Sequence, residues 1–491
     1  MSEHRIFIKR IALVGIAKFF TNFRGLVLLP LLTKTIGAAG YGIWAQILIT
    51  VGLITSFMVL SLTSAPVRFL PAEKDNKKVA KGIFTVIFTI LFVSVFFALF
   101  LFLFSNSFAS ILLHDPSASF FIKLASALLI LEALNQASLG SFRIFAQIKK
   151  YSLLTILQTL LEIILVSAWV LCGFGLFGAI VALLIVRIIV LALSLRSIVS
   201  HLGFATPDFS ILRPYLEFGL PLLLMGLFDT MINSSDRYVI GFFKGAAAVG
   251  VYSATYSIGI LAVIFIYPIS YILASTIFKL YDEGDIDKAK LYLSYSLKYF
   301  LLFSIPSVFG LTVLAKTILK SLTTSEFILF NSMFVVLWVS LGAVVYGVQV
   351  VYGQIIMLQR NTRFFIFAFG LGLATNLILN IIFIPYFGVI AAAVTTLLAY
   401  FIVGLIVYFK SVKYMKFKVD IPFIFKSVFA SSIMGVAIYF ISPVGILKIL
   451  LTTIGGAAIY FGVLFLLRAL TKEEIKIFAS ALKLDNFYEK Y

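Results

Sequence analysis

The chain has 491 residues, of which 62% are hydrophobic and only 12% are charged, and its mean hydropathy is +1.13. Soluble domains carry about 25% charged residues, so this chain lacks the charge to cover a water-facing surface and is predicted to lie in a membrane. One cysteine, Cys172, and three dispersed histidines exclude a disulfide framework and a Cys- or His-based metal cluster. No metal and no cofactor are expected.

Apolar stretches of spanning length predict an all-α integral membrane protein with about fourteen transmembrane helices, because each needs ~20 residues to cross ~30 Å of hydrocarbon. In chain order the stretches fall at 8–32, 41–62, 82–104, 120–146, 152–172, 176–198, 213–240, 247–278, 290–314, 327–352, 362–384, 387–409, 422–441 and 446–467. The connections between them are short, so no domain outside the membrane is expected.

The net charge of +19 has a simple source in this setting. Lys and Arg concentrate at the N-terminus, in every second loop and in the C-terminal tail, as the positive-inside rule describes for cytoplasmic segments. We therefore expect a multi-pass protein of the cell (plasma) membrane with both termini in the cytoplasm. Membrane lipids are expected partners, and nucleic acid is not.

Two short blocks recur along the chain. Gly37 and its neighbours match the segment around Gly245 at an offset of 208, and Gly175 matches Gly388 at an offset of 213. The pattern predicts two parallel six-helix bundles that enclose a central cleft, a plan known from secondary transporters. The predicted domains are 1–212, 213–410, two additional helices in 411–468 and a tail at 469–491. Chance similarity between Gly- and Ala-rich helices is the alternative.

Polar and basic side chains interrupt the first and seventh predicted spans. A charge at bilayer depth is costly, so it usually faces a cavity or a partner. The residues predicted to bind substrate in the cleft are Lys18, Asn22, Arg24, Asn233 and Arg237. The alternative for Lys18 and Arg24 is that their side chains extend to the membrane interface.

Acidic residues in the spans are candidates for coupling transport to an ion. They are Asp229, Asp236 and Glu132. Each has a structural alternative: Asp236 can form a local pair with Arg237, and Asp229 can be protonated and buried. Glu132 or Glu162 can pair with Arg187, which would be a purely structural contact.

The sequence also resembles a known family. The segments that carry the resemblance are 29–46, 236–241, 249–256, 268–270 and 385–393. They are similar to polysaccharide-export flippases of the Wzx type, within the multidrug/oligosaccharidyl-lipid/polysaccharide exporter superfamily. The resemblance implies translocation of a polyprenyl-diphosphate-linked oligosaccharide from the cytoplasmic to the outer leaflet by alternating access. It further implies coupling to H⁺ or Na⁺, and glycan polymerases or glycosyltransferases as partners.

Two rival functions stay open. The first is a cation-coupled multidrug exporter of the same superfamily, which would favour an acidic cleft over the basic residues of the first span. The second is a membrane glycosyltransferase or polysaccharide polymerase. Because the sequence has no phosphate-binding Gly loop, no HExxH and no Gly-x-Ser-x-Gly, we expect that the chain is not an enzyme.

Overall fold

The computed structural model describes residues 3–59, 62–63, 66, 70, 75–144, 147–328, 332–359, 361, 363–471 and 474. Within this part, side chains are described except at 3–19, 22, 143, 218, 221–222, 271–272 and 275. The described residues form helices and no strand, which confirms the predicted all-α class.

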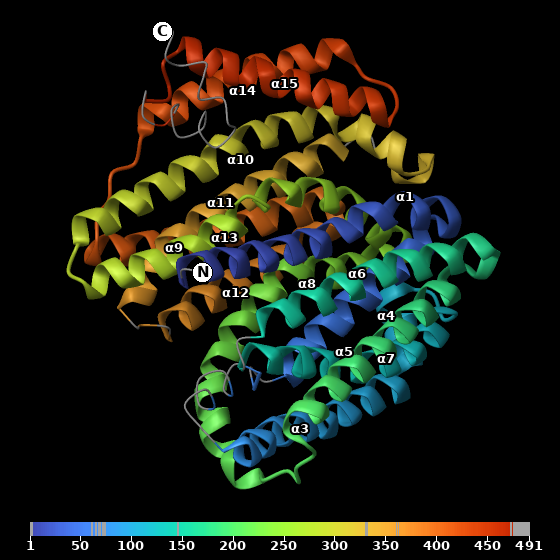
Figure 1. Cartoon of the computed structure of the whole chain (residues 1–491). Coiled ribbons are helices and arrows are strands. Elements are labelled where there is room, and N and C mark those ends of the chain that lie inside the picture. The colour runs from blue at the N-terminus through green and yellow to red at the C-terminus, as the bar shows by residue number, and fades with distance from the viewer. Residues whose placement is uncertain are drawn as a thin grey trace. The chain divides into compact units, whose positions relative to one another are not determined.

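The helices follow one another with short connections (Figure 1). In chain order they are α1 (Glu3–Met58), α3 (Asn76–Leu103), α4 (Ser105–Leu113), α5 (Ala118–Ile144), α6 (Ile148–Trp169), α7 (Gly175–Leu202), α8 (Leu212–Gly259), α9 (Ile266–Asp282), α10 (Ile286–Leu322), α11 (Ser332–Leu358), α12 (Arg363–Phe387), α13 (Val389–Tyr414), α14 (Ile421–Ile441) and α15 (Ile446–Leu466). Single helical turns lie at Val170–Phe174, Phe209–Ile211, Ile260–Val263 and Ser325–Phe327.

The number of spans agrees with the prediction. In the described part of the chain, 11 helical segments are long and apolar enough to cross a membrane. Three of them, Phe23–Met58, Ile148–Leu202 and Leu223–Val263, each cover two predicted spans. The longest has 55 residues, which at 1.5 Å per residue is far more than one crossing requires. Counting these three as pairs gives about fourteen transmembrane helices.

Glycines with positive φ mark where such pairs bend. Gly37 in α1 has φ 66° and ψ −176°, and Gly245 in α8 has φ 78° and ψ −179°. Gly175 and Gly388, the glycines paired by the second repeat block, have φ 52° and 59°. Residues with a side chain rarely adopt these angles, so all four positions require glycine. The matching conformations at both offsets support the predicted internal repeat.

The two copies meet through reciprocal backbone contacts. A Cβ atom on Gly42 would overlap the carbonyl oxygen of Ala246, and a Cβ atom on Gly250 would overlap the carbonyl oxygen of Ala38. These pairs exchange under the 208 offset, so the contact has approximate two-fold symmetry. Small residues let helix backbones approach this closely within a membrane.

By packing, the chain divides into two compact units. The first comprises Met1–Ser257, Leu322–Leu329 and Asn361–Val403, and the second comprises Ile258–Ser321, Phe330–Arg360 and Gly404–Tyr491. Within the first unit α5 packs against α3 and α7, and α1 packs against α6 (Figure 1). The domain boundaries predicted from the sequence stay a prediction.

Within the second unit, polar side chains join α14 and α15 to α10. The Tyr460 hydroxyl donates to the Leu302 carbonyl oxygen at 2.9 Å and lies 2.7 Å from the Ser427 hydroxyl. The buried Lys298 ammonium lies 2.9 Å from Glu474 and 3.1 Å from Asp420. The second unit is therefore held partly by buried polar contacts.

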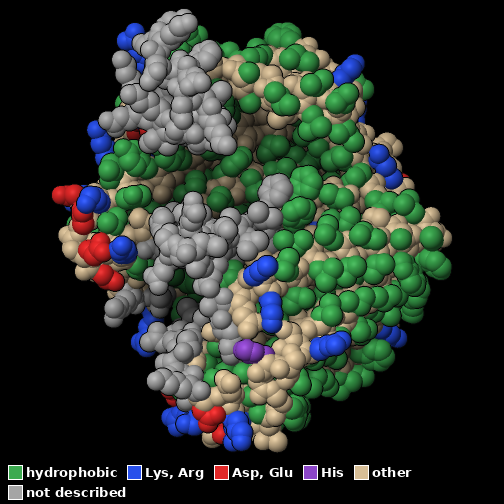
Figure 2. All heavy atoms as spheres, viewed as in Figure 1, with side chains coloured by type: hydrophobic (Ala, Val, Ile, Leu, Met, Phe, Trp, Pro, Cys, Tyr) green, Lys and Arg blue, Asp and Glu red, His purple; other side chains and the backbone are tan. Residues whose placement is uncertain are grey.

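Hydrophobic side chains cover much of the visible surface, and charged ones are sparse on it (Figure 2). Large apolar residues such as Phe92, Phe440 and Leu466 are 72 to 80% exposed. Such extensive apolar exposure is unfavourable in water and favourable in hydrocarbon, as expected for a multi-pass membrane protein.

Candidate functional site

The site begins with a sharp reversal in α8. Arg237 and Tyr252 are 15 residues apart, a separation that would place them about 22 Å apart along an unbroken helix. Their side chains instead meet, with the Arg237 guanidinium carbon 5.1 Å from the Tyr252 ring centroid. The bend at Gly245 brings the two halves of α8 together and so creates this contact.

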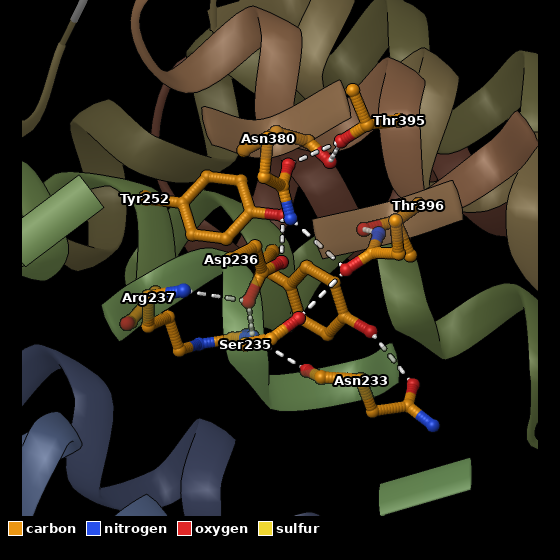
Figure 3. Close-up of polar contacts among 12 residues, drawn as sticks. Asn233, Ser235, Asp236, Arg237, Tyr252, Asn380, Thr395 and Thr396 are labelled. Atoms are coloured by element: carbon orange, nitrogen blue, oxygen red, sulfur yellow. Dashed lines mark hydrogen bonds and ion pairs between the residues drawn. The ribbon is translucent and has the colours of Figure 1, made fainter. Parts of the chain in front are cut away.

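Arg237 is buried and held on several sides. Its Nη1 donates to Asp236 at 2.9 Å and to the Asn233 carbonyl oxygen at 2.8 Å. The Tyr256 ring centroid lies 4.1 Å from its guanidinium carbon, within the range of a cation–π contact. The guanidinium therefore has one fixed orientation (Figure 3).

Asp236 is fully buried behind this arginine. One carboxylate oxygen accepts from the Arg237 backbone N–H at 2.8 Å as well as from the guanidinium, and the other accepts from the Tyr252 hydroxyl at 2.5 Å (Figure 3). The predicted local pair between Asp236 and Arg237 thus forms. Because a tyrosine completes it, the acid has donors on both oxygens.

A cavity of about 200 Å³ lies beside Arg237. Its polar and aromatic lining consists of Arg24, Tyr41, Trp44, Arg237, Ser253 and Ser257. Leu28, Leu32, Ala45, Leu48, Ile49 and Gly25 complete it. Among the described residues that line it there are two guanidiniums and no carboxylate.

Two buried polar groups of this lining make no hydrogen bond to any described residue. They are Nε of Arg237 and the hydroxyl of Ser253, both on residues that are 5% exposed. A buried polar group without a partner is costly, so such groups in a cavity are suited to bind a polar ligand or water.

Arg24 reaches the cavity from α1 and is held from α6. Its Nη1 forms an ion pair with Glu162, and one turn earlier the hydroxyls of Thr21 and Thr159 lie 3.5 Å apart. Both contacts join residues that are 138 positions apart. The two helices therefore run in register here, and Arg24 is fixed beside the cavity.

The ion pairs continue away from the cavity as a chain of alternating charges. Glu162 also pairs with Arg187 of α7, and Arg187 pairs with Glu132 of α5. The Glu162 side chain is 0% exposed and that of Arg187 is 7% exposed. Ionised groups at such depth require partners of this kind.

A second polar cluster joins α8 to α12 and α13. The Ser235 hydroxyl donates to Asn376 at 2.6 Å, and Asn380 donates to the same amide oxygen at 2.9 Å. Thr395 donates to Asn380, and Asn376 donates to Thr396 at 3.3 Å (Figure 3). All five side chains are buried, so this cluster orients the segment of α8 that carries Asp236 and Arg237.

Of the predicted substrate-binding residues, Arg24 and Arg237 line the cavity. Asn233 supports Arg237 through its backbone, and its side-chain oxygen accepts from the Tyr256 hydroxyl at 3.2 Å. The side chains of Lys18 and Asn22 lie outside the described part of the structure.

The three predicted ion-coupling acids lie in different surroundings. Asp236 contacts Arg237, Glu132 contacts Arg187, and Asp229 is half-buried on α8 with its carbonyl oxygen accepting from the Asn233 amide at 3.0 Å. Asp236 forms its ion pair with a residue that lines the cavity, Arg237.

Sequence reasoning did not place four cavity residues in the site: Tyr41, Trp44, Ser253 and Ser257. The sequence did carry a signal for Trp44. In the repeat it occupies the same place as Tyr252, which contacts Arg237. An aromatic pair in the repeated hairpins could have been weighed as part of the site.

A family model described as "Polysaccharide biosynthesis protein" matches residues 31–332, more than half of the chain. The chain belongs to this family. No curated protein matches the sequence. Membership of the polysaccharide biosynthesis protein family agrees with the resemblance found from the sequence motifs.

Solved structures with the same fold are transporters. The lipid II flippase MurJ in an inward closed conformation has a TM-score of 0.77 at 20% identity, over 95% of this chain and 98% of that one. An inward-facing multidrug resistance MATE family transporter of the MOP superfamily has a TM-score of 0.67 at 14% identity, over 81% and 97%. A MOP superfamily transporter from Pyrococcus furiosus, described by the reverse polarity of its binding pocket, has 0.61 at 16%, over 82% and 95%.

At these identities the likeness shows the fold alone. The chain therefore has the fold of flippases and transporters of the multidrug/oligosaccharidyl-lipid/polysaccharide exporter superfamily. These relatives are transporters, in agreement with the expectation that the chain is not an enzyme.

Proposed function

We propose that the chain flips a polyprenyl-diphosphate-linked oligosaccharide from the cytoplasmic to the outer leaflet by alternating access, in the synthesis of a cell-surface glycan. The observation that carries this proposal is the cavity with the guanidiniums of Arg24 and Arg237 in its lining and no described carboxylate among them. Hydrocarbon excludes a diphosphate, so its carrier must supply cationic donors within the membrane. Arginine is well suited, because its planar fork matches phosphate oxygens.

The size of the cavity agrees with recognition of the diphosphate. About 200 Å³ is less than the ~300–1,000 Å³ of sites that enclose a whole small-molecule ligand. It can hold a compact anion, and a bulky glycan would extend beyond it. The polyprenyl tail is compatible with the apolar helix surfaces that face lipid.

Ion coupling is proposed at Asp236. Its carboxylate contacts Arg237, which lines the cavity, whereas Glu132 is held by Arg187 away from it. Protonation of Asp236, or binding of Na⁺ to it, would weaken its hold on Arg237 and so change how strongly the cavity attracts an anion. Asp229, half-buried on the same helix, is the second candidate for this role.

The charges of the loops support a proposed orientation of the chain in the membrane that fits transport out of the cytoplasmic leaflet. Both termini would lie in the cytoplasm of a plasma-membrane protein, because Lys and Arg concentrate in the segments on that side. Glycosyltransferases that build the glycan on its lipid, and a polymerase that uses it afterwards, are the partners we propose.

The second candidate is a cation-coupled multidrug exporter, which the fold shared with MATE transporters favours. A cationic drug would have to enter a cavity lined by two guanidiniums, and like charges repel. The lining therefore favours the anionic substrate.

The test uses the purified protein in proteoliposomes with a polyprenyl-diphosphate disaccharide that carries a fluorophore on the sugar. Transfer between leaflets is followed by the fraction that a membrane-impermeant reductant can quench. We expect Arg24→Ala and Arg237→Ala each to reduce the transfer rate at least about tenfold, as expected for loss of a charge-assisted contact to phosphate.

The matched control is Arg213→Ala, because Arg213 is an exposed arginine paired only at the surface with Glu217. It should transfer the lipid at the wild-type rate. Wild-type transfer by both cavity variants would refute the proposal. Efflux of a cationic dye without lipid transfer would establish the drug exporter instead.

A further inference from the structure

Glu162 is a fully buried acid that touches the proposed site without lining the cavity. The two oxygens of its carboxylate have different partners. Oε2 pairs with Arg24, whereas Oε1 pairs with Arg187 and accepts from the Gln158 amide at 3.1 Å. One oxygen therefore contacts the arginine that lines the cavity, and the other contacts residues that do not line it.

Loss of the contact between Arg24 and Glu162 would still leave Glu162 with an ionic partner. After Arg24 turns away, Oε1 of Glu162 keeps both donors, and Arg187 keeps Glu132 as a second partner. Arg24 is the more accessible member of the pair, since its side chain is 26% exposed while Glu162 is 0% exposed. Breaking this single contact therefore leaves no charged group without an ionic partner, provided that Arg24 gains an anion.

An anion in the cavity would offer Arg24 such a replacement. Arg24 and Arg237 both line the cavity, but they differ in how firmly they are held. Arg237 contacts the rings of Tyr252 and Tyr256 and pairs with its own neighbour Asp236, whereas Arg24 on α1 pairs with Glu162 on α6. Arg24 is thus the cavity guanidinium whose partner can be exchanged.

We propose that Glu162 is a positioning residue: it is an internal counter-anion that holds Arg24 at the cavity in the absence of substrate and competes with the substrate's diphosphate for it. The proposal rests on the anion-binding role proposed above for the cavity. Competition of this kind lowers the affinity of the cavity for the substrate and speeds its release. A carrier needs release as much as it needs binding.

The test measures binding of inorganic pyrophosphate to the full-length protein in detergent by isothermal titration calorimetry. Glu162→Gln should bind pyrophosphate at least about threefold more tightly than wild type, because a partly exposed ion pair no longer competes for Arg24. In the lipid-transfer assay the same variant should have a lower KM and a lower kcat. A purely structural role would lower activity without lowering KM.

Glu132→Gln is the matched control for this measurement. It removes the same charge from the same chain of ion pairs, but Glu132 contacts Arg187 and not Arg24. Its pyrophosphate affinity should stay within about twofold of wild type, because the ion pair on Arg24 is left in place. Thermal unfolding of each variant checks that it is folded, and Glu162→Asp, which keeps the charge but shortens the reach, replaces the glutamine variant if that one does not fold.

The results separate the two proposals. Unchanged or weaker pyrophosphate binding by the Glu162 variant, with binding by wild type intact, would overturn the role of Glu162 alone. Equal tightening in the Glu132 variant would also overturn it, since a general change of field would then explain both. If wild type itself does not bind pyrophosphate, the anion cavity is refuted and the role of Glu162 falls with it.

Discussion

The reciprocal contact between the repeated hairpins gives a sharp prediction for Gly42→Ala. A Cβ atom at this position would overlap the Ala246 carbonyl oxygen and lie only 2.9 Å from the Gly250 backbone nitrogen. Both are backbone atoms, which cannot rotate aside as a side chain can. One of the two hairpins must therefore shift to accommodate a single methyl group.

The expected cost combines two effects. Overpacking a close contact costs ~1–3 kcal/mol, and the upper end applies here because backbone must move. Replacing a helical glycine by alanine recovers up to ~1 kcal/mol of helix propensity. The net destabilisation is ~2 kcal/mol. Gly52→Ala, on the same helix with no atom within 4 Å of its Cβ, receives only the gain, so the two variants should differ by ~3 kcal/mol.

Thermal unfolding in detergent, followed by tryptophan fluorescence or aggregation, measures this difference as a lower unfolding temperature for Gly42→Ala than for Gly52→Ala. Gly250→Ala should behave like Gly42→Ala, since its Cβ would overlap the Ala38 carbonyl oxygen. The double variant should lose less than the sum, because the first alanine already separates the hairpins. Equal stability of the Gly42 and Gly52 variants would show that the hairpins are not in backbone contact.

Two further predictions concern buried ion pairs. Asp236→Asn leaves the buried Arg237 cation without a carboxylate and should destabilise the fold by ~3–5 kcal/mol, seen as a lower unfolding temperature. Asp287→Asn, in an exposed pair with Lys290, should change stability by no more than ~0.5 kcal/mol. Equal effects of the two substitutions would contradict the burial argument. At Asp420, which lies outside the spans, partial burial raises the pKa, but hydrogen bonds from Lys298 and the Phe423 backbone N–H, with the charges of Lys298 and Lys418, together outweigh it. The pKa therefore lies below its ordinary value. Its contribution to stability is therefore complete above the unfolded-state pKa of about 4 and is lost as pH falls below it. Unfolding temperatures of wild type and Asp420→Asn should accordingly converge at low pH, and a difference that grows on acidification would have the wrong sign.

Local signals explain why the spans and the repeat could be predicted from the sequence. Hydropathy identifies a span without reference to any other segment, and a glycine that must adopt positive φ is visible at its own position. Gly37 and Gly245 matched as residues and then adopted the same backbone angles.

The partners within the site could not be predicted in the same way. Hydropathy shows that Arg24 is a charge in a span, but its partner Glu162 lies 138 residues away on another helix. That pairing depends on how α1 packs against α6, which no local pattern encodes. Trp44 and Tyr41 were overlooked for a related reason, since an aromatic residue in a membrane helix contacts lipid, a neighbouring helix or a cavity with the same side chain.

The arrangement of charge explains how a basic site can exist within the bilayer. In the ion pairs that begin at the two cavity arginines, three arginines (Arg24, Arg187, Arg237) pair with three acids (Glu132, Glu162, Asp236), so their formal charges cancel. Insertion therefore places no net charge from these six groups in the membrane, which would be costly. Of these six charged groups, only the guanidiniums of Arg24 and Arg237 line the cavity, and the acids that pair with them do not. An anion that enters the cavity therefore contacts cationic donors, although the six groups together are neutral. The positive character of the lining depends on how the side chains pack rather than on the number of charges.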